Sequence, residues 1–236
     1  MKGQGLTSEP HPNGSTEPGG AEVPGGFDFA VLDARPEPYA AAPTIMFRLR
    51  ITESSGAPVH ALALRCQIRI EPQRRRYDAD EEGRLLELFG PTPRWGESLR
   101  PFLWTHVATT VTGFSGSTDI DLPVACTYDF EVAAAKYMHA LGDGEIPLLL
   151  LFSGMAFGRS GAGVGAQPVA WDREASYRLP VRVWRATMDQ YFPNSGWLRI
   201  SRDSLDALQR YKATHALPTW DHVVERLLDA AGGQEP

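Results

Sequence analysis

The segment Thr44-Ile-Met-Phe-Arg-Leu-Arg-Ile-Thr52 alternates apolar and polar side chains along most of its length. Every second residue from Ile45 to Ile51 is large and apolar, whereas Arg48 and Arg50 occupy the intervening positions. Because successive side chains of a β-strand point to opposite faces, this pattern predicts a strand with one face in a core and the other in water. Such a strand is typical of an antiparallel sheet.

The neighbouring segments repeat this two-residue period and extend the predicted sheet. Residues 59–71 are predicted to form the next apolar strand, and Glu53-Ser-Ser-Gly-Ala-Pro58 before them is typical of a hairpin turn. Phe27, Phe29 and Val31 predict an earlier strand by the same alternation. We expect further strands, rich in Thr, Val and Leu, at residues 104–114, 118–122 and 147–152.

Residues 128–141 fit two periods at once. Their apolar side chains recur as on one face of a helix, yet the segment also fits a strand. Gly142-Asp-Gly144 would then join it to the apolar run 147–152 as a hairpin turn joins two strands. We predict the strand.

Helical spacing appears in residues 80–89, which end at Gly90-Pro91, and again in the last part of the chain. There, helices are expected after Pro180, after the N-cap Ser201 and after the N-cap Thr219. Strands first and helices last indicate the α+β class. We predict an antiparallel, sandwich-like β-sheet structure with the C-terminal helices packed on it.

The chain divides into a tail and one domain. Residues 1–26 contain seven Gly and four Pro and no aromatic residue, so they cannot bury enough surface to offset their conformational entropy, and we predict a disordered tail. Residues 27–178 are predicted to form a β-rich region, and residues 179–236 a C-terminal helical segment of the same domain. Oligomeric state does not follow from these patterns.

Charge and composition narrow the classes of partner and compartment. The formal net charge of -6 argues against a broad nucleic-acid surface, which needs clustered Lys and Arg. The longest apolar run, Ile146 to Phe152, is far shorter than the roughly 20 residues of a membrane helix. No apolar secretory signal begins the sequence, so we expect a cytoplasmic protein without a membrane span.

Few residues are arranged for chemistry. Cys66 and Cys126 lack metal-site spacing, and buried reduced thiols are expected, with a disulfide left open. Asp119 and Asp121 lie two apart on a predicted strand, so their carboxylates share a face and could hold a divalent cation, or could simply be solvated. Arg74-Arg-Arg76, followed by acidic residues, is interpreted as a solvated, self-neutralising turn. We expect no cofactor and no catalytic set.

Aromatic residues give the more suggestive pattern. The sequence has six Trp, a residue type enriched in cores and in binding hot spots. Trp95 stands in a Pro- and Gly-rich stretch between Pro91 and Pro101, so we expect it to be partly exposed. The partner-binding candidates are Arg94, Trp95, Phe102 and Trp104.

Four motifs carry a resemblance to a known family. They are Arg94-Trp-Gly96, Thr127-Tyr-Asp-Phe130, Pro147-Leu-Leu-Leu-Leu-Phe-Ser-Gly154 and Tyr191-Phe-Pro-Asn-Ser-Gly-Trp197. With them the chain from Phe27 onward resembles an uncharacterised actinobacterial domain family of unknown function, whose genes tend to lie beside those of a NiFe hydrogenase. The resemblance implies a genomic neighbourhood and assigns no functional residues.

The second half carries a weaker resemblance. A strand, the Gly142-Asp-Gly144 turn, a strand that ends in Phe152-Ser-Gly-Met-Ala-Phe157, and then helices are similar in order to the SecB export chaperone. In that family an antiparallel sheet carries helices on one side, and apolar grooves hold unfolded clients. Residues 71–114 depart from it as a long insertion.

These patterns favour a non-enzymatic accessory or chaperone-like protein that binds a protein partner or client. The family resemblance implies that hydrogenase subunits are among the candidates for that partner, in maturation, assembly or regulation. The alternative is a small-ligand or metal-dependent enzyme that uses Asp119 and Asp121 with a histidine brought close by the fold.

Overall fold

The computed structural model describes residues 23–127, 129, 132–160, 163–193, 195 and 199–232. Its strands are β1 (Phe27–Pro36), β2 (Thr44–Glu53), β3 (Val59–Ile70), β4 (Phe102–Phe114), β5 (Ser117–Ala125), β6 (Glu145–Ser160), β7 (Gly163–Pro168) and β8 (Glu174–Pro180). Its helices are α1 (Ala79–Phe89), α2 (Trp95–Ser98), α3 (Ala133–Ala140), α4 (Val181–Tyr191), α5 (Arg202–Thr214) and α6 (Trp220–Gly232), with 3-10 turns at Pro72–Arg74 and Thr92–Arg94.

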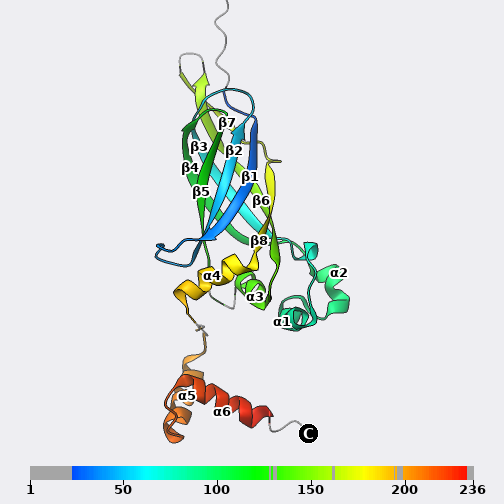
Figure 1. The fold of residues 1–236 in the computed structure, drawn as a ribbon, viewed down its shortest axis with the longest axis vertical. Helices are drawn as coiled ribbons and strands as arrows, with labels where there is room; N and C mark the ends of the chain where they lie inside the picture. Colours follow the sequence, from blue (N-terminus) through cyan, green and yellow to red (C-terminus); the bar gives the residue numbers. More distant parts are fainter. Residues whose placement is uncertain are drawn as a thin grey trace, which may run out of the picture.

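The strands form two antiparallel sheets that stand face to face (Figure 1). One sheet has the order β1-β2-β5, and the other has the order β4-β3-β6-β7. Strand β6 is long enough to pair with β8 along its first half and with β7 along its second half. The apolar run 147–152 therefore lies in a central strand, since β6 has β3 on one side and β8 on the other.

The core lies between the two sheets, where their inward-facing side chains meet. Alternate residues of β2 and β3 are fully buried, as their two-residue period requires. The Phe29 ring of one sheet stacks on the Phe152 ring of the other, with centroids 4.1 Å apart, and the edge of Phe47 meets Tyr177 at 5.9 Å. Two packed antiparallel sheets confirm the sandwich-like prediction.

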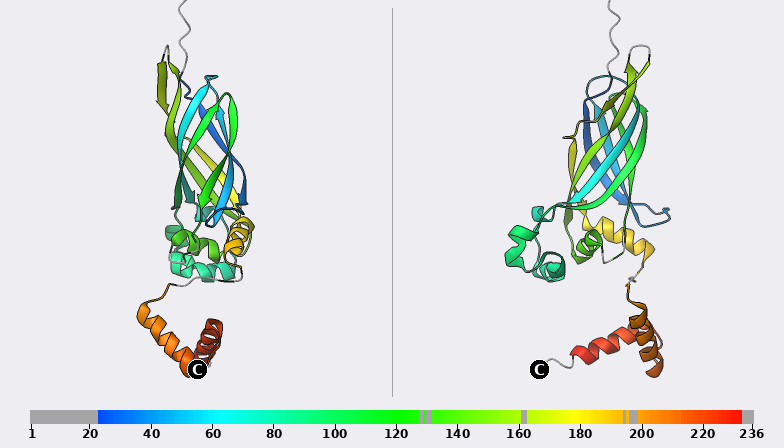
Figure 2. Two further views of the ribbon diagram at one scale, coloured as in Figure 1. Left: turned by 90° about the vertical axis from the view of Figure 1, so that its left-hand side faces the viewer. Right: turned by 180° about the vertical axis from the view of Figure 1, so that it is seen from behind.

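Helices close one end of this sandwich (Figure 2). Helix α4 follows β8 directly after Pro180, and it packs against β1, β2 and β8 with Val181, Trp184 and Met188 buried. The Tyr191 hydroxyl donates to the carbonyl of Ala40, at 2.6 Å, and so ties the end of α4 to the β1–β2 loop. A C-terminal helix packed on antiparallel sheets confirms the predicted α+β arrangement.

Residues 133–140 correct the predicted strand over 128–141. They form helix α3, which buries Ala134, Tyr137 and Met138 on one face. Alanine has the highest intrinsic helix propensity of all residue types, so the run Ala133-Ala-Ala135 favours a helix. The helical spacing of the apolar residues favours the same structure. Gly142-Asp-Gly144 therefore joins a helix to β6 and does not form a β-hairpin turn.

The predicted tail 1–26 is described only at its end, because residues 1–22 lie outside the described residues. Residues 23–26 lie against β6 and β7. A Cβ placed on Gly165 would stand 2.6 Å from Cγ2 of Val23, and one on Gly158 would stand 2.4 Å from Cδ of Pro24. Glycine at both positions thus leaves room for the segment that leads into β1.

Helices α5 and α6 are joined by a turn and diverge at a wide angle, and this α5–α6 hairpin lies apart from the sandwich in every view (Figures 1 and 2). The Ser201 hydroxyl accepts from the amide of Ser204 at the start of α5, which confirms the predicted N-cap. In the connecting turn, Lys212 donates to the Pro218 carbonyl at 3.0 Å and lies 5.9 Å from the Trp220 ring centroid. Thr219 accepts from the His222 amide at 3.3 Å.

Candidate binding surfaces

The structure places Trp95 in the interior and corrects the expectation that it is partly exposed. Its side chain is 8% exposed, and its indole N–H donates to the Gly90 carbonyl at 2.9 Å. The edge of the ring meets Tyr77, with centroids 5.2 Å apart. The Pro- and Gly-rich stretch folds back onto the end of α1, which covers the tryptophan and satisfies its one polar group.

The other partner-binding candidates do not form one surface with it. Phe102 packs edge-on against Tyr137 at 5.8 Å, and Trp104 packs against Phe47 at 6.2 Å, so both rings belong to the margin of the core. Arg94 is exposed at the end of a 3-10 turn. A role of these residues in partner binding stays a prediction.

At the helical end of the sandwich, a buried ion pair joins Arg75 to Glu81, and no sequence pattern had indicated it. The two side chains are only 9% and 3% exposed. Glu81 also accepts from the Gly142 amide at 2.7 Å, and Arg75 donates to the Glu145 carbonyl at 3.1 Å. The interpretation of Arg74-Arg-Arg76 as a solvated turn is therefore wrong at its central residue.

A tyrosine pair extends this buried cluster. The hydroxyls of Tyr77 and Tyr137 are 2.8 Å apart, and the Tyr77 hydroxyl also lies 2.8 Å from the Pro72 carbonyl. Burial raises the pKa of both phenols, that of Tyr137 to about 12. Both groups therefore stay protonated at neutral pH, and their role is to tie α3 to the turn that precedes α1.

Asp119 and Asp121 lie on the outer face of β5, side by side as predicted, but arginines engage both. Arg50 binds Asp119 with its Nε 2.7 Å from Oδ1, and this hydrogen bond lowers the pKa of the Asp119 carboxyl. Arg35 reaches Asp121 at 2.8 Å. A divalent cation would have to displace these guanidinium groups. Within the described part of the chain, no three His, Cys, Asp or Glu side chains are grouped to hold a metal ion.

Burial also changes the pKa values of two cysteines and one histidine. Cys66 and Cys126 are free and buried, and burial raises the pKa of each thiol to about 12, which disfavours the reactive thiolate. His139 on α3 packs edge-on against Trp184, at 4.5 Å between ring centroids. Burial, with the nearby Arg185 cation, lowers the pKa of its imidazole to about 4.

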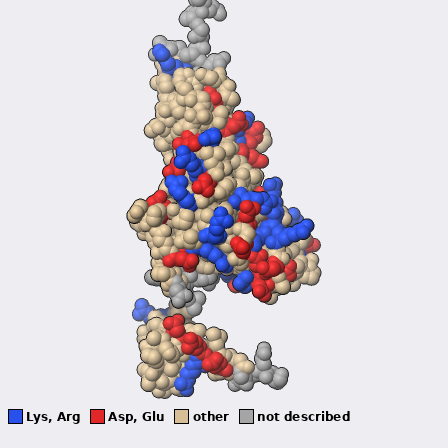
Figure 3. All heavy atoms as spheres, viewed as in Figure 1, with Lys and Arg blue, Asp and Glu red and all other residues tan. Residues whose placement is uncertain are grey.

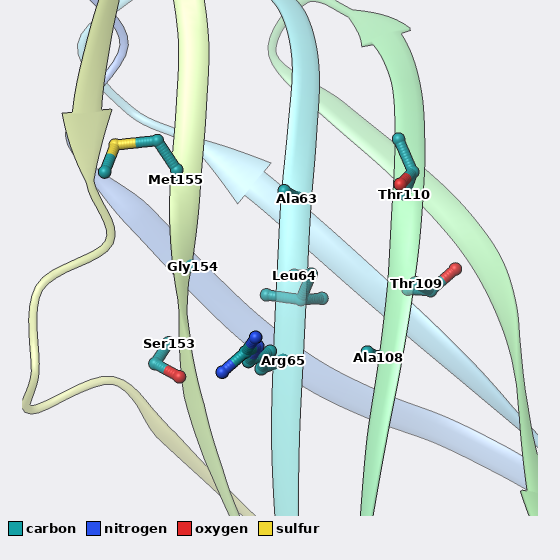
Figure 4. Close-up of a pocket in the computed structure, with 9 residues that line it drawn as sticks. All are labelled: Ala63, Leu64, Arg65, Ala108, Thr109, Thr110, Ser153, Gly154 and Met155. Atoms are coloured by element: carbon teal, nitrogen blue, oxygen red, sulfur yellow. The ribbon is translucent and has the colours of Figure 1, made fainter.

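A groove crosses the outer face of the larger sheet (Figure 4). It has a volume of about 650 Å³ and lies over β3, β4 and β6, with Ala63, Ala108 and Gly154 at its floor. Strands β3 and β6 approach so closely here that a Cβ on Gly154 would stand 2.1 Å from the Ala63 carbonyl oxygen. Arg65 on β3 and Ser153 on β6 are a cross-strand pair, and Figure 4 shows their polar groups on the same side, next to each other.

The α5–α6 hairpin presents a second surface, which is apolar. Val223 is the one buried residue within 199–232, a range that the structure describes completely. On α6, Val224 and Leu228 are 51% and 66% exposed, and Trp220 and Leu227 are exposed beside them. Figure 3 shows acidic side chains in a line across the hairpin, next to an uncharged area. An uncovered apolar stripe of this kind is a candidate interaction surface.

A family model described as a family of unknown function, DUF6084, matches residues 25–236. The chain belongs to this family. Membership confirms the part of the resemblance that concerns an uncharacterised domain covering the chain from its first strand onward. No curated protein matches the DUF6084 chain.

Solved structures similar to the DUF6084 chain include two β-glucosidases. The enzyme from Kluyveromyces marxianus is 7% identical with a TM-score of 0.24, and the match covers 64% of this chain and 14% of that one. β-Glucosidase 3B from Thermotoga neapolitana is 12% identical with a TM-score of 0.23, over 64% of this chain and 16% of that one. The DUF6084 chain thus corresponds to about one sixth of each enzyme, and TM-scores this low support no conclusion about activity.

The helices of the DUF6084 chain were also compared with the requirements of a bilayer. Among the described residues, no helix combines the length and the apolar character needed to cross a membrane.

Proposed function

We propose that this chain is a non-enzymatic accessory protein that binds an apolar client segment on its α5–α6 hairpin. The observation that supports this proposal is the near absence of burial in a well-formed pair of helices. In residues 202–232, the side chains of Val224, Leu227 and Leu228 remain exposed, and only Val223 is buried.

The energetics favour a partner over an isolated hairpin. Helices of this length are marginal in water by themselves, and packing of an apolar face supplies most of their stability in proteins. Covering the stripe would contribute roughly 25 cal/mol for each Å² of apolar surface removed from water. A client that lays an apolar segment along α6 would supply that cover.

Charge indicates which kind of client segment fits best. Asp221, Glu225 and Asp229 recur every four residues along α6, so they form a line on one flank of the apolar stripe. A helix whose apolar face is flanked by Lys or Arg would match both the stripe and this acidic flank. We therefore assign the site to a basic amphipathic helix of a protein client.

The identity of the client is drawn from the sequence motifs. Their resemblance to a domain family encoded beside NiFe-hydrogenase genes makes hydrogenase subunits the first clients to examine, in maturation, assembly or regulation. A chaperone-like action, by analogy with SecB, would consist of holding such a helix before it reaches its final place. In this proposal the sandwich is the scaffold, and the hairpin makes the contact.

Binding of purified NiFe-hydrogenase subunits to the full chain tests the proposal. Val224→Asp combined with Leu228→Asp places charge in the stripe and should weaken binding at least tenfold in a fluorescence titration. Leu32→Asp is the matched control, because Leu32 is an exposed apolar residue on β1, 42% exposed, and its replacement should leave binding unchanged.

Two results would refute different parts of the proposal. If no hydrogenase subunit binds at micromolar concentration, the hydrogenase link is wrong. If a subunit binds wild type and the doubly substituted chain equally, with unchanged helical circular dichroism, the contact lies elsewhere and the hairpin is not the site.

A further inference from the structure

The outer faces of the two sheets differ in whether a carboxylate lies close enough to balance the positive charge of their arginines. On β2, Arg48 and Arg50 both reach Asp119 across the sheet. On β3, Arg65 has no hydrogen-bond or ion-pair partner among the described residues, although it stands in the middle of a strand. Its cross-strand neighbours are Ala108 on β4 and Ser153 on β6, neither of which carries a negative charge.

Among the nine residues that line the groove, Arg65 is the one that carries a charge. The nine side chains or backbone segments that line the 650 Å³ space include no Asp or Glu. Ser153 supplies a hydroxyl, which Figure 4 shows on the side of the Arg65 guanidinium, and Thr110 supplies another on β4. A cation and hydroxyl donors without a carboxylate form a site that is complementary to an anion.

Apart from Thr109, the other residues that line the groove are apolar or glycine. Ala63 and Ala108 keep the sheet surface low beside Arg65, and Met155 lines the groove on β6 with its side chain directed away from β3 (Figure 4). Methionine adapts its shape to the group that it contacts. The volume lies within the range of small-molecule sites, which pair an apolar lining with a few placed polar groups.

We propose that this groove binds a small organic carboxylate with an unbranched apolar chain. The carboxylate accepts hydrogen bonds from the Arg65 guanidinium and the Ser153 hydroxyl, and the chain lies over the low surface formed by Ala63 and Ala108. The site is independent of the α5–α6 hairpin, so it adds a ligand-binding activity to the proposed client binding.

Isothermal titration calorimetry with sodium decanoate, below its micelle concentration, tests the proposal on the full chain. Wild type should bind decanoate with a dissociation constant below about 1 mM. Arg65→Ala should weaken it about tenfold or more, since a charge-assisted hydrogen bond is lost. Arg65→Lys should recover part of that loss because it restores the charge without the two-pronged geometry. Decanol, which has the chain without the charge, should bind weakly to all three.

Two further variants separate this groove from other apolar surfaces. Ala108→Phe fills the groove from an exposed position and should abolish decanoate binding while Arg65 remains. Val224→Asp with Leu228→Asp removes the apolar stripe of α6 and should leave decanoate binding unchanged. Absence of decanoate binding to wild type, or equal binding to wild type, Arg65→Ala and Ala108→Phe, would overturn the proposal.

Discussion

The sandwich and the α5–α6 hairpin use the same kind of amphipathic pattern and reach opposite outcomes. On β2 every apolar residue from Ile45 to Ile51 at alternate positions is completely buried, because a second sheet covers that face. On α6 an equally regular apolar stripe stays mostly in solvent. A periodic pattern therefore shows that a face needs cover, and it does not show whether the same chain supplies it.

The largest expected effect comes from replacing one apolar residue in each of the two regions and comparing the free energies of unfolding. Phe47→Ala should lower the free energy of unfolding by about 4 kcal/mol, because Phe47 is completely buried and its removal leaves a cavity. Leu228→Ala, on the exposed stripe, should change it by no more than about 0.5 kcal/mol. Urea denaturation followed by tryptophan fluorescence measures both. Comparable losses for the two variants would mean that the hairpin is covered within the chain.

A second test concerns the helices that are locked to the sandwich. Arg75→Ala should cost about 3 kcal/mol, because Glu81 would keep a buried charge without its cation. Arg75→Met combined with Glu81→Leu should recover most of this loss, since both charges are then removed. The same urea experiment compares the three proteins, and a double variant no better than Arg75→Ala would contradict the explanation.

The smallest expected effect is a dependence of stability on pH through His139. Its pKa is about 4 in the folded chain, below its ordinary value of 6.5, so the unfolded chain takes up the proton first. Stability present above pH 6.5 should therefore be lost as the pH falls toward 4, by on the order of 2 kcal/mol.

His139→Phe isolates this contribution. The phenyl ring can still pack against Trp184 but does not titrate, so the decrease in urea midpoint between pH 7 and pH 4.5 should be smaller than in wild type. An identical decrease in both proteins would assign the pH dependence to other groups.

Much of the fold follows from local patterns. The strands β1 to β5 and the helices α1, α4, α5 and α6 were predictable because each has one dominant period. Helix α3 was not, because its residues fit two periods and the following Gly142-Asp-Gly144 favoured the wrong one. Its packing against α1 and β4, together with the helix propensity of Ala133-Ala-Ala135, favours the helix.

The binding surfaces were less predictable, for a physical reason. Trp95 was expected near the surface from its Pro- and Gly-rich surroundings, but a loop can fold back on a helix, and burial is set by contacts distant in sequence. The Arg75–Glu81 pair depends in the same way on Gly142 and Glu145. The groove beside Arg65 requires three strands in register, which no single segment encodes.

The turn between α5 and α6 bears on how quickly a client would be captured. Lys212 holds Pro218 and covers Trp220, and Thr219 caps the next helix, so the angle between the helices is set before any encounter. A preformed receptor loses little chain entropy when its ligand arrives, so any slow folding step belongs to the client. For a client segment that is already helical, the observed association rate should then rise in proportion to client concentration without reaching a plateau.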